Sequence, residues 1–319
     1  TASELLRDWF EERWNDRWCV DISEEVADII DNHSWVQQKP PYYIYLKIAY
    51  HLSQEARAGL NEFRLPKIFE ERLLPFQQQA VKIAAYHIHK RGGVIIGDVV
   101  GLGKTITAAA VAKVFQEDFF YKTLIISPPN LTPMWESYKQ EYDLHADIVS
   151  IGTVQNDLKD KKRYKLLIVD ESHNLRNNTG KKYKAIKEYI SENDCKVVLL
   201  SATPYNKSFQ DIANQLSLFI TEDNDLGISP EHYIESIGGA TDFFSRHPEV
   251  FIRNIKAFQL SEFADDWREL LRFYMVRRTR SFIKTNYTEL DPFNGRRFLT
   301  FSNGDRSYFP DRIPKKVEK

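Results

Sequence analysis

Short runs of aliphatic residues alternate with helical patterns across residues 67–225. Three of these runs, residues 94–96, 166–169 and 197–200, contain no polar side chain. A strand that is apolar on both faces is typical of a parallel sheet covered by helices on both sides. The alternation of such strands with helices therefore predicts an α/β domain with a parallel sheet flanked by helices. In a sheet of this kind, ligands bind at the carboxyl ends of the strands.

The first apolar run leads into a glycine-rich loop, residues 97–105, and then into a helix. Strand, glycine loop and helix in this order form the context of a phosphate-binding P-loop. The free N–H groups at a helix start attract phosphate, and Gly101 and Gly103 let the backbone wrap tightly around it. Lys104 supplies a positive charge for the β- and γ-phosphates, and Thr105 supplies a hydroxyl ligand for Mg²⁺.

Two carboxylates, Asp170 and Glu171, end the second apolar run. Asp170 can hold Mg²⁺ through water, and Glu171 can orient and deprotonate an attacking water molecule. Each signal has an ordinary alternative. Strands often stop at charged residues, and the loop departs from the strict P-loop pattern because Asp98 stands where a glycine is required. Together, however, the two segments predict a site for Mg²⁺ and a nucleoside triphosphate.

Two further segments carry polar groups of interest. The third apolar run ends in Ser201 and Thr203, and Gln77 lies at the start of the helix that precedes the first strand. A glutamine amide offers both a donor and an acceptor, which suits the edge of an adenine base. Taken singly, a Ser/Thr/Pro turn and a glutamine at a helix start are both common, so a purely structural interpretation of each stays open.

These four segments, in this order, resemble the first motor lobe of superfamily-two helicases, and most closely that of the SWI/SNF-type DNA translocases. In that family the loop has an acidic residue, two variable residues and Gly-Leu-Gly-Lys-Thr, so Asp98 fits. Residues 170–173 match the DEAD/DEAH-type box, and residues 201–203 match the third motif. The resemblance spans roughly residues 67–285. It implies a RecA-like fold, the cofactors ATP and Mg²⁺, and hydrolysis coupled to movement along double-stranded DNA.

The resemblance also assigns roles to single residues. The residues implied to be catalytic are Lys104, Asp170 and Glu171. The residues implied to bind nucleotide are Gln77, Gly101, Leu102, Gly103, Lys104, Thr105 and Ile106, with Thr105 and Asp170 at the metal. Coupling of hydrolysis to nucleic acid is implied for Ser201 and Thr203. The residues implied to contact nucleic acid are Ser127, Pro128, Arg277, Arg278 and Arg280. We expect the arginine cluster to close the lobe away from the triphosphate, although a solubilising surface is the ordinary interpretation of a charge run.

The sequence predicts four parts: a helical accessory segment (residues 1–66), the ATP-binding lobe (67–225), a helical protrusion with the basic closing segment (226–285) and an extended tail (286–319). No second run of motifs follows, so we expect this chain to be one lobe of a longer motor, with a second RecA-like lobe beyond the tail. A weaker similarity in the accessory segment is to bacterial helicases with an upstream phospholipase D-like nuclease domain.

Composition limits the alternatives only loosely. The net charge is −1, which gives no global signal for nucleic acid, and the two cysteines, Cys19 and Cys195, lack metal-binding spacing. No apolar run approaches the ~18 residues of a membrane span. We therefore expect a cytoplasmic protein with no membrane partner. The resemblance to bacterial helicases implies a bacterial protein that is associated with the nucleoid. Two other functions stay open: a restriction-type or RNA helicase motor, and a scaffold lobe that binds nucleotide without turnover.

Overall fold

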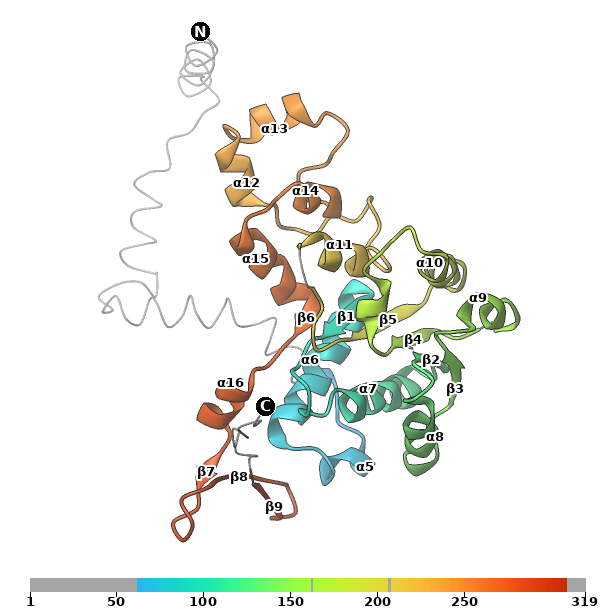
Figure 1. Cartoon of the computed structure of the whole chain (residues 1–319), viewed down its shortest axis with the longest axis vertical. Coiled ribbons are helices and arrows are strands. Elements are labelled where there is room, and N and C mark those ends of the chain that lie inside the picture. Colours follow the sequence, from blue (N-terminus) through green and yellow to red (C-terminus); the bar gives the residue numbers. More distant parts are fainter. Residues whose placement is uncertain (1–61, 162, 206–207, 309–319) are drawn as a thin grey trace, which may run out of the picture. The chain divides into compact units, whose positions relative to one another are not determined.

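A computed structural model confirms the parallel sheet that the apolar runs predict (Figure 1). It describes residues 62–161, 163–205 and 208–308. Within them, six strands form one sheet in the order β3-β2-β4-β5-β1-β6, and every neighbouring pair is parallel. The strands are β1 (Gly93–Ile96), β2 (Thr123–Ser127), β3 (Ala146–Ser150), β4 (Leu166–Val169), β5 (Lys196–Leu200) and β6 (Met275–Val276). The fold class is therefore α/β with a RecA-like parallel sheet, as expected.

Helices cover both faces of this sheet because its strands are apolar on both faces. In β1, Val94 and Ile96 belong to one core, whereas Ile95 belongs to the other. The first core is covered by α6 (Pro75–Arg91), α7 (Lys104–Phe119) and α8 (Thr132–Glu141), with the short α5 (Lys67–Glu70) at its margin. The second is covered by α9 (Val154–Asp157), α10 (Lys181–Asn193), α11 (Gln210–Leu216), α14 (Ile255–Gln259) and α15 (Ala264–Tyr274).

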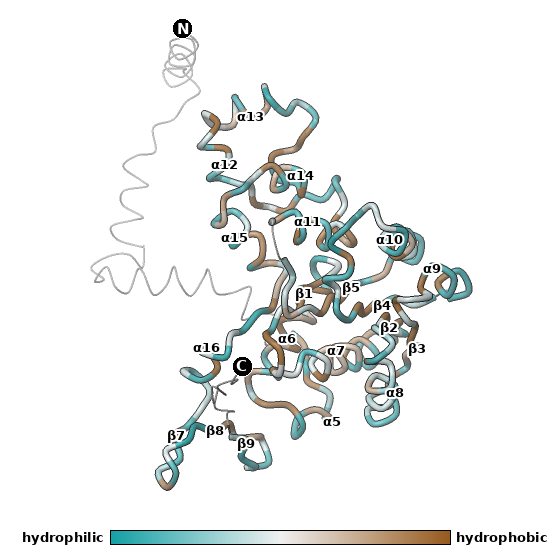
Figure 2. Tube along the Cα trace, in the orientation of Figure 1, coloured by the Kyte–Doolittle hydropathy of each residue, from teal (hydrophilic) through white to brown (hydrophobic). Residues whose placement is uncertain are grey.

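Figure 2 shows the hydropathy of each residue along the chain, and in two helices this pattern agrees with which residues are buried. In α10, the buried residues Tyr183, Ile186 and Ile190 recur at helical spacing and face the second core, while lysines occupy the outer surface. In α7, every residue from Thr107 to Gln116 is buried, because this helix packs against both the sheet and α6. Among the described residues, no helix is both long enough and apolar enough to cross a bilayer.

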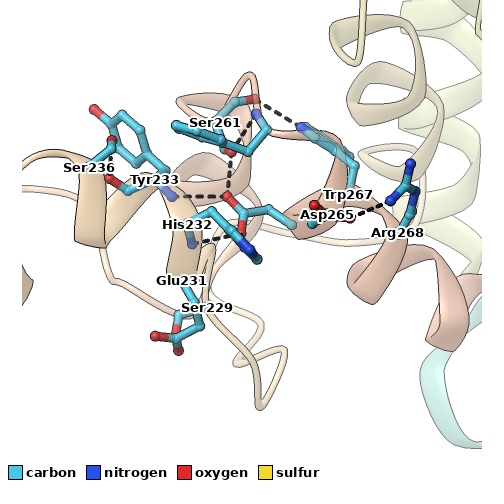
Figure 3. Close-up of polar contacts among 11 residues, drawn as sticks. Ser229, Glu231, His232, Tyr233, Ser236, Ser261, Asp265, Trp267 and Arg268 are labelled. Atoms are coloured by element: carbon cyan, nitrogen blue, oxygen red, sulfur yellow. Dashed lines mark hydrogen bonds and ion pairs between the residues drawn. The ribbon is translucent and has the colours of Figure 1, made fainter.

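The protrusion contains α12 (Glu231–Ser236) and α13 (Ala240–Arg246), which share a small apolar cluster with α14. A buried carboxylate, Asp266, joins the start of α12 to α15, which packs in the second core. This side chain accepts hydrogen bonds from the backbone N–H groups of His232 and Tyr233 and from the hydroxyl of Ser261 (Figure 3). The contact with the His232 ring raises the pKa of that imidazole. Since α15 continues into β6, the predicted protrusion also supplies the edge strand of the main sheet.

The predicted tail is more regular than expected. After α16 (Arg280–Asn286), the strands β7 (Glu289–Leu290), β8 (Arg297–Thr300) and β9 (Arg306–Tyr308) form a separate antiparallel sheet. Its residue Leu299 shares an apolar cluster with Phe76 of α6 and Leu102 of the glycine loop. The chain divides into two units, residues 1–55 and 56–319. The predicted accessory helices and nuclease similarity fall almost wholly on residues 1–61, and the end of the tail falls on 309–319. Both stretches lie outside the described residues.

Candidate nucleotide-binding site

The strand order brings the predicted motifs together. Strands β4, β5 and β1 are consecutive neighbours, so the segments that follow them leave the sheet at the same edge. The glycine loop follows β1, the acidic box follows β4 and the third motif follows β5. Backbone hydrogen bonds to neighbouring strands fix the points where two of these segments leave the sheet. The N–H of Ser201 donates to Ile96 O at 3.2 Å, and that of Asp170 donates to Ile126 O at 2.8 Å.

The glycine loop has the backbone shape that phosphate binding requires. Gly101 and Gly103 have φ values of 85° and 80°, in the left-handed region that favours glycine. A Cβ atom at Gly103 would lie 2.3 Å from Nε2 of Gln77. Helix α7 begins at Lys104, so its first N–H groups are free for an anion. The Lys104 ammonium donates to the carbonyl of Asp98 at 3.0 Å and therefore lies along the loop.

The side chain of Gln77 is hydrogen-bonded to the glycine loop. Its Nε2 donates to the carbonyl of Leu102 at 3.0 Å, and its Oε1 accepts from the backbone N–H of Leu74 at 2.9 Å. The side chain is 7% exposed. The amide thus fixes the start of α6 against the glycine loop. Reading of an adenine edge by Gln77 stays a prediction, and any such contact would use the donor and acceptor capacity that these two bonds leave.

Asp170 is a buried carboxylate held by two donors. Its Oδ2 accepts from the indole N–H of Trp135 at 2.9 Å, and its Oδ1 accepts from the backbone N–H of Glu171 at 2.9 Å. Burial raises the pKa of Asp170, while these two hydrogen bonds and the nearby Lys104 charge oppose that rise. Sequence reasoning missed the role of Trp135. Trp135 and Asp170 are 35 residues apart, so no local pattern in the sequence indicated this contact.

Glu171 has a different environment from its neighbour. Its backbone is left-handed, with φ of 50°, which is uncommon for a residue other than glycine and is often found at functional sites. Its side chain is 38% exposed, and Oε2 lies 3.0 Å from Nδ1 of His173. One carboxylate of the pair is therefore fixed and buried, whereas the other reaches solvent. This difference fits the predicted division between a metal ligand, Asp170, and a base, Glu171.

The oxygen donors at this edge suit Mg²⁺ better than a transition metal. Asp170 offers a carboxylate and Thr105 offers a hydroxyl, and Mg²⁺ is commonly held by one or two protein oxygens together with phosphates and water. Within the described ranges, no group of three or more His, Cys, Asp or Glu residues could hold a metal on its own. Asp170 and Thr105 therefore fit a metal that arrives with the nucleotide.

The arginine cluster lies elsewhere than predicted. Arg278 is buried and forms an ion pair with Asp98 of the glycine loop; its guanidinium also donates to the carbonyl of Phe76. Arg280 Nη2 donates to the carbonyl of Val100, in the same loop, at 3.1 Å. We expected the cluster to lie away from the triphosphate, whereas these two residues contact the loop that is predicted to bind it. The reason is that β6 pairs with β1, so the segments after both strands run side by side.

Two nucleic-acid assignments are contradicted by burial. The guanidinium of Arg278 is enclosed by protein acceptors, so it is not available to a DNA phosphate. Ser127 is fully buried at the end of β2, and its hydroxyl lies 3.2 Å from that of Thr132. The assignments of the half-buried Pro128 and the exposed Arg277 stay predictions. The assignment of Arg280 also stays a prediction.

The third motif forms a tight turn beside the acidic box. Ser201 is fully buried, and its hydroxyl accepts from the backbone N–H of Thr203 at 3.2 Å. Arg176, which follows the acidic box, donates from Nη2 to both the carbonyl and the hydroxyl of Thr203. Arg176 therefore links the segment after the acidic box to the third motif, a contact that was not predicted from the sequence.

Comparison with known proteins gives matches over parts of the chain. The family model described as the res subunit of type III restriction enzymes matches residues 135–206. A SWI/SNF-related regulator of chromatin, subfamily A-like protein 1 homolog, from Caenorhabditis elegans is 25% identical over 63% of this chain and 32% of its own length. The uncharacterized ATP-dependent helicase YqhH of Bacillus subtilis is 28% identical over 57% of this chain and 36% of its own length.

A solved structure of the Sulfolobus solfataricus SWI2/SNF2 ATPase core in complex with double-stranded DNA aligns with a TM-score of 0.49. The alignment has 18% identity and covers 72% of this chain and 52% of that one. The chain spans about a third of the length of the first two curated relatives. In sequence, the chain is similar to SWI/SNF-type helicases of superfamily two, which confirms the resemblance read from its motifs.

Proposed function

We propose that this chain, which is similar to SWI/SNF-type helicases, is the ATP-binding lobe of a DNA-dependent ATPase that moves along double-stranded DNA. One observation carries the proposal: the strand order gathers Lys104, the Asp170–Glu171 pair and the Ser201–Thr203 turn at one edge of the sheet. The similarity to proteins named as SWI/SNF-related regulators and ATP-dependent helicases supports the same activity.

Each group at this edge has a task in the proposed reaction. The N–H groups at the start of α7 and the Lys104 ammonium bind the phosphates. Thr105 and Asp170 hold Mg²⁺, which when bound neutralises charge on the β- and γ-phosphates. Glu171, whose carboxylate reaches solvent, orients the attacking water and accepts its proton. Catalysis of phosphoryl transfer depends mainly on such positioning and charge stabilisation.

The proposed motor needs more than this lobe. A second RecA-like lobe would supply the arginine finger, which contributes about 10³–10⁵ in rate in related reactions. The 319-residue chain alone is therefore expected to bind ATP and to hydrolyse it slowly. Double-stranded DNA is the proposed track, and an upstream nuclease domain is a proposed neighbour in a bacterial protein that acts on the nucleoid.

A restriction-type motor is the second candidate, because the restriction-enzyme family model matches residues 135–206. The two candidates differ in what they do to duplex DNA. A translocase displaces a third strand from a triplex without separating the duplex, whereas an unwinding helicase releases one strand of the duplex itself. Triplex-displacement and strand-separation assays with the full-length protein would distinguish them.

Nucleotide binding tests the proposal directly. Lys104→Ala removes a charge-assisted phosphate contact, whose loss costs about 1.5–3 kcal/mol or more, so affinity for Mg²⁺–ATP should fall at least about 10-fold. The control is Lys122→Ala, which removes an exposed lysine just before β2. Isothermal titration calorimetry gives both affinities. Equal affinity in the Lys104→Ala variant and the wild type would refute the site.

Turnover tests the role of the base. Glu171→Gln in the full-length protein should keep ATP affinity and lower hydrolysis by about 10²–10⁴, the usual contribution of a general base. Steady-state ATPase measurements with and without duplex DNA provide the comparison. Near-normal hydrolysis by this variant would show that another group accepts the proton.

A further inference from the structure

A buried glutamine outside all the motifs joins the acidic box to the third motif. Gln215 lies near the end of α11 and is fully buried. Its Oε1 accepts from the hydroxyl of Ser172, in the acidic box, at 2.8 Å. Its Nε2 donates to the carbonyl of Pro204, the residue that follows the third motif. The two ends of one amide thus hold two segments that leave neighbouring strands, β4 and β5.

The preceding residue of α11 reinforces this connection. Asn214 Nδ2 donates to the backbone carbonyl of Arg176 at 2.6 Å. The guanidinium of Arg176 in turn donates to the carbonyl and hydroxyl of Thr203. Tyr183 of α10 fixes the backbone of α11, because its hydroxyl donates to the carbonyl of Asn214 at 2.7 Å. The box and the turn are therefore held by two adjacent side chains on one short helix.

Because Gln215 is fully buried, leaving either end of its amide without a hydrogen-bond partner would cost free energy of folding. The neighbouring residues Ile212 and Leu216 are fully buried in the second core, where an apolar side chain would normally lie. A buried polar group left without a partner is costly, so Ser172 cannot separate from Gln215 Oε1 without a penalty. Nε2 also donates to the carbonyl of Asp211 at 2.9 Å, so separation from Pro204 would remove one of the two hydrogen bonds that this group donates. Because Gln215 is bonded to both segments, a displacement of the third-motif turn would also shift Ser172, the residue next to the proposed base, Glu171.

We propose that Gln215 is a positioning residue that transmits the arrangement of the third motif to Glu171. This inference rests on the proposed DNA-dependent ATPase function and deepens it. The hydrogen-bond partners of Gln215 are Ser172, Pro204 and Asp211, and none of these is proposed to bind nucleotide; Gln215 acts through Ser172 on the backbone that places the Glu171 carboxylate. Its loss should therefore change how strongly DNA stimulates hydrolysis, while ATP affinity and DNA affinity stay the same.

The test uses Gln215→Leu in the full-length protein, with kcat, KM for ATP and DNA affinity measured with and without duplex DNA. The expected result is a DNA-stimulated kcat about 10-fold or more below wild type, since small misplacements of a reacting group can cost up to about 10²-fold. KM and DNA affinity should stay within about 2-fold. Ser172→Ala should give the same loss, and the double variant should lose no more than either single variant.

The matched control is Gln116→Leu. Gln116 is also buried and its amide is also bonded at both ends, here to backbone groups alone: it donates to Asp143 O at 3.0 Å and accepts from His145 N at 2.7 Å. It lies in α7 on the other face of the sheet. Gln116→Leu should cost similar stability and leave DNA stimulation intact. Equal loss of stimulation in both glutamine variants would overturn the inference, because the effect would then be structural only.

Three further outcomes are decisive. Absence of DNA-stimulated turnover in the wild type would refute the proposed function itself. Normal stimulation in Gln215→Leu, alongside a stimulated wild type, would refute only the role of Gln215. If Gln215→Leu does not fold, Ser172→Ala decides alone, because it removes one hydroxyl and keeps Gln215 bonded to Pro204. Normal stimulation in that variant would refute the inference, and a loss with unchanged KM would support it.

Discussion

The ion pair between Arg278 and Asp98 should contribute strongly to stability, because it is enclosed. Asp98 is fully buried, and its carboxylate accepts from the Arg278 guanidinium and, at 2.7 Å, from the Arg278 backbone N–H. The same guanidinium lies 5.0 Å from the centre of the Phe76 ring and donates to the Phe76 carbonyl. Arg278→Ala removes every side-chain contact and leaves one backbone donor on a buried charge.

The size of the effect follows from this geometry. Removing one partner of a buried ion pair costs about 3–5 kcal/mol, because the remaining charge is uncompensated. The backbone hydrogen bond to Asp98 remains in the variant and offsets up to about 1.5–3 kcal/mol of this penalty. Loss of the cation–π contact with Phe76 adds about 0.5–2 kcal/mol. We therefore expect a loss of about 2–4 kcal/mol in the free energy of unfolding. An exposed pair would give about 0–1 kcal/mol.

Urea unfolding of the 319-residue chain, followed by circular dichroism with linear extrapolation, measures this difference. The control is Arg268→Ala, because Arg268 pairs with Asp265 and both side chains are more than half exposed. That variant should stay within about 0.5 kcal/mol of wild type. A loss below about 1 kcal/mol for Arg278→Ala, or an equal loss for both arginines, would refute the reasoning. ATP affinity should also fall for Arg278→Ala, since Asp98 belongs to the phosphate loop.

Three other predictions concern the same edge. Trp135→Phe removes the indole donor to Asp170. Mg²⁺-dependent turnover should fall about 10–100-fold, as commonly happens when a metal ligand loses its hydrogen-bonding partner. An unchanged Mg²⁺ titration of the ATPase rate would contradict this. Gly103→Ala places a methyl group 2.3 Å from Gln77 Nε2, at a residue whose φ is positive. The free energy of unfolding should therefore fall by more than about 1 kcal/mol, and ATP affinity should fall with it. Urea unfolding and calorimetry measure these two quantities, and no change in either would contradict the loop geometry. Burial raises the pKa of Asp170 above its ordinary value of 3.8, so this group binds its proton more tightly in the folded state. Its contribution to stability is then greatest below pH 3.8 and is lost as pH rises through the raised pKa. Unfolding free energies of wild type and Asp170→Asn across that range should diverge with this sign, and a parallel pair of curves would exclude it.

The class of fold and the order of the chemical groups along the chain could be predicted from local sequence patterns. Short apolar runs such as residues 166–169, bounded by polar residues and alternating with helical patterns, indicate buried strands of a parallel sheet. The glycine loop was recognisable for the same local reason: Gly101 and Gly103 adopt the positive φ that glycine permits, and Lys104 follows at the start of a helix. Patterns of this kind depend on neighbours in sequence, so they can be read without the structure.

Which of these groups contact one another depends on how the chain packs. Arg278 and Asp98 are 180 residues apart, and Trp135 and Asp170 are 35 apart, so no local pattern predicts either contact. The same basic cluster that was expected to face DNA is buried in part, because β6 enters the sheet beside β1 and brings Arg278 onto the phosphate loop. Gln215 likewise gains its partners only when β4 and β5 become neighbours. Strand order is a property of the packed chain, since it depends on the burial of all six strands and their helices at once.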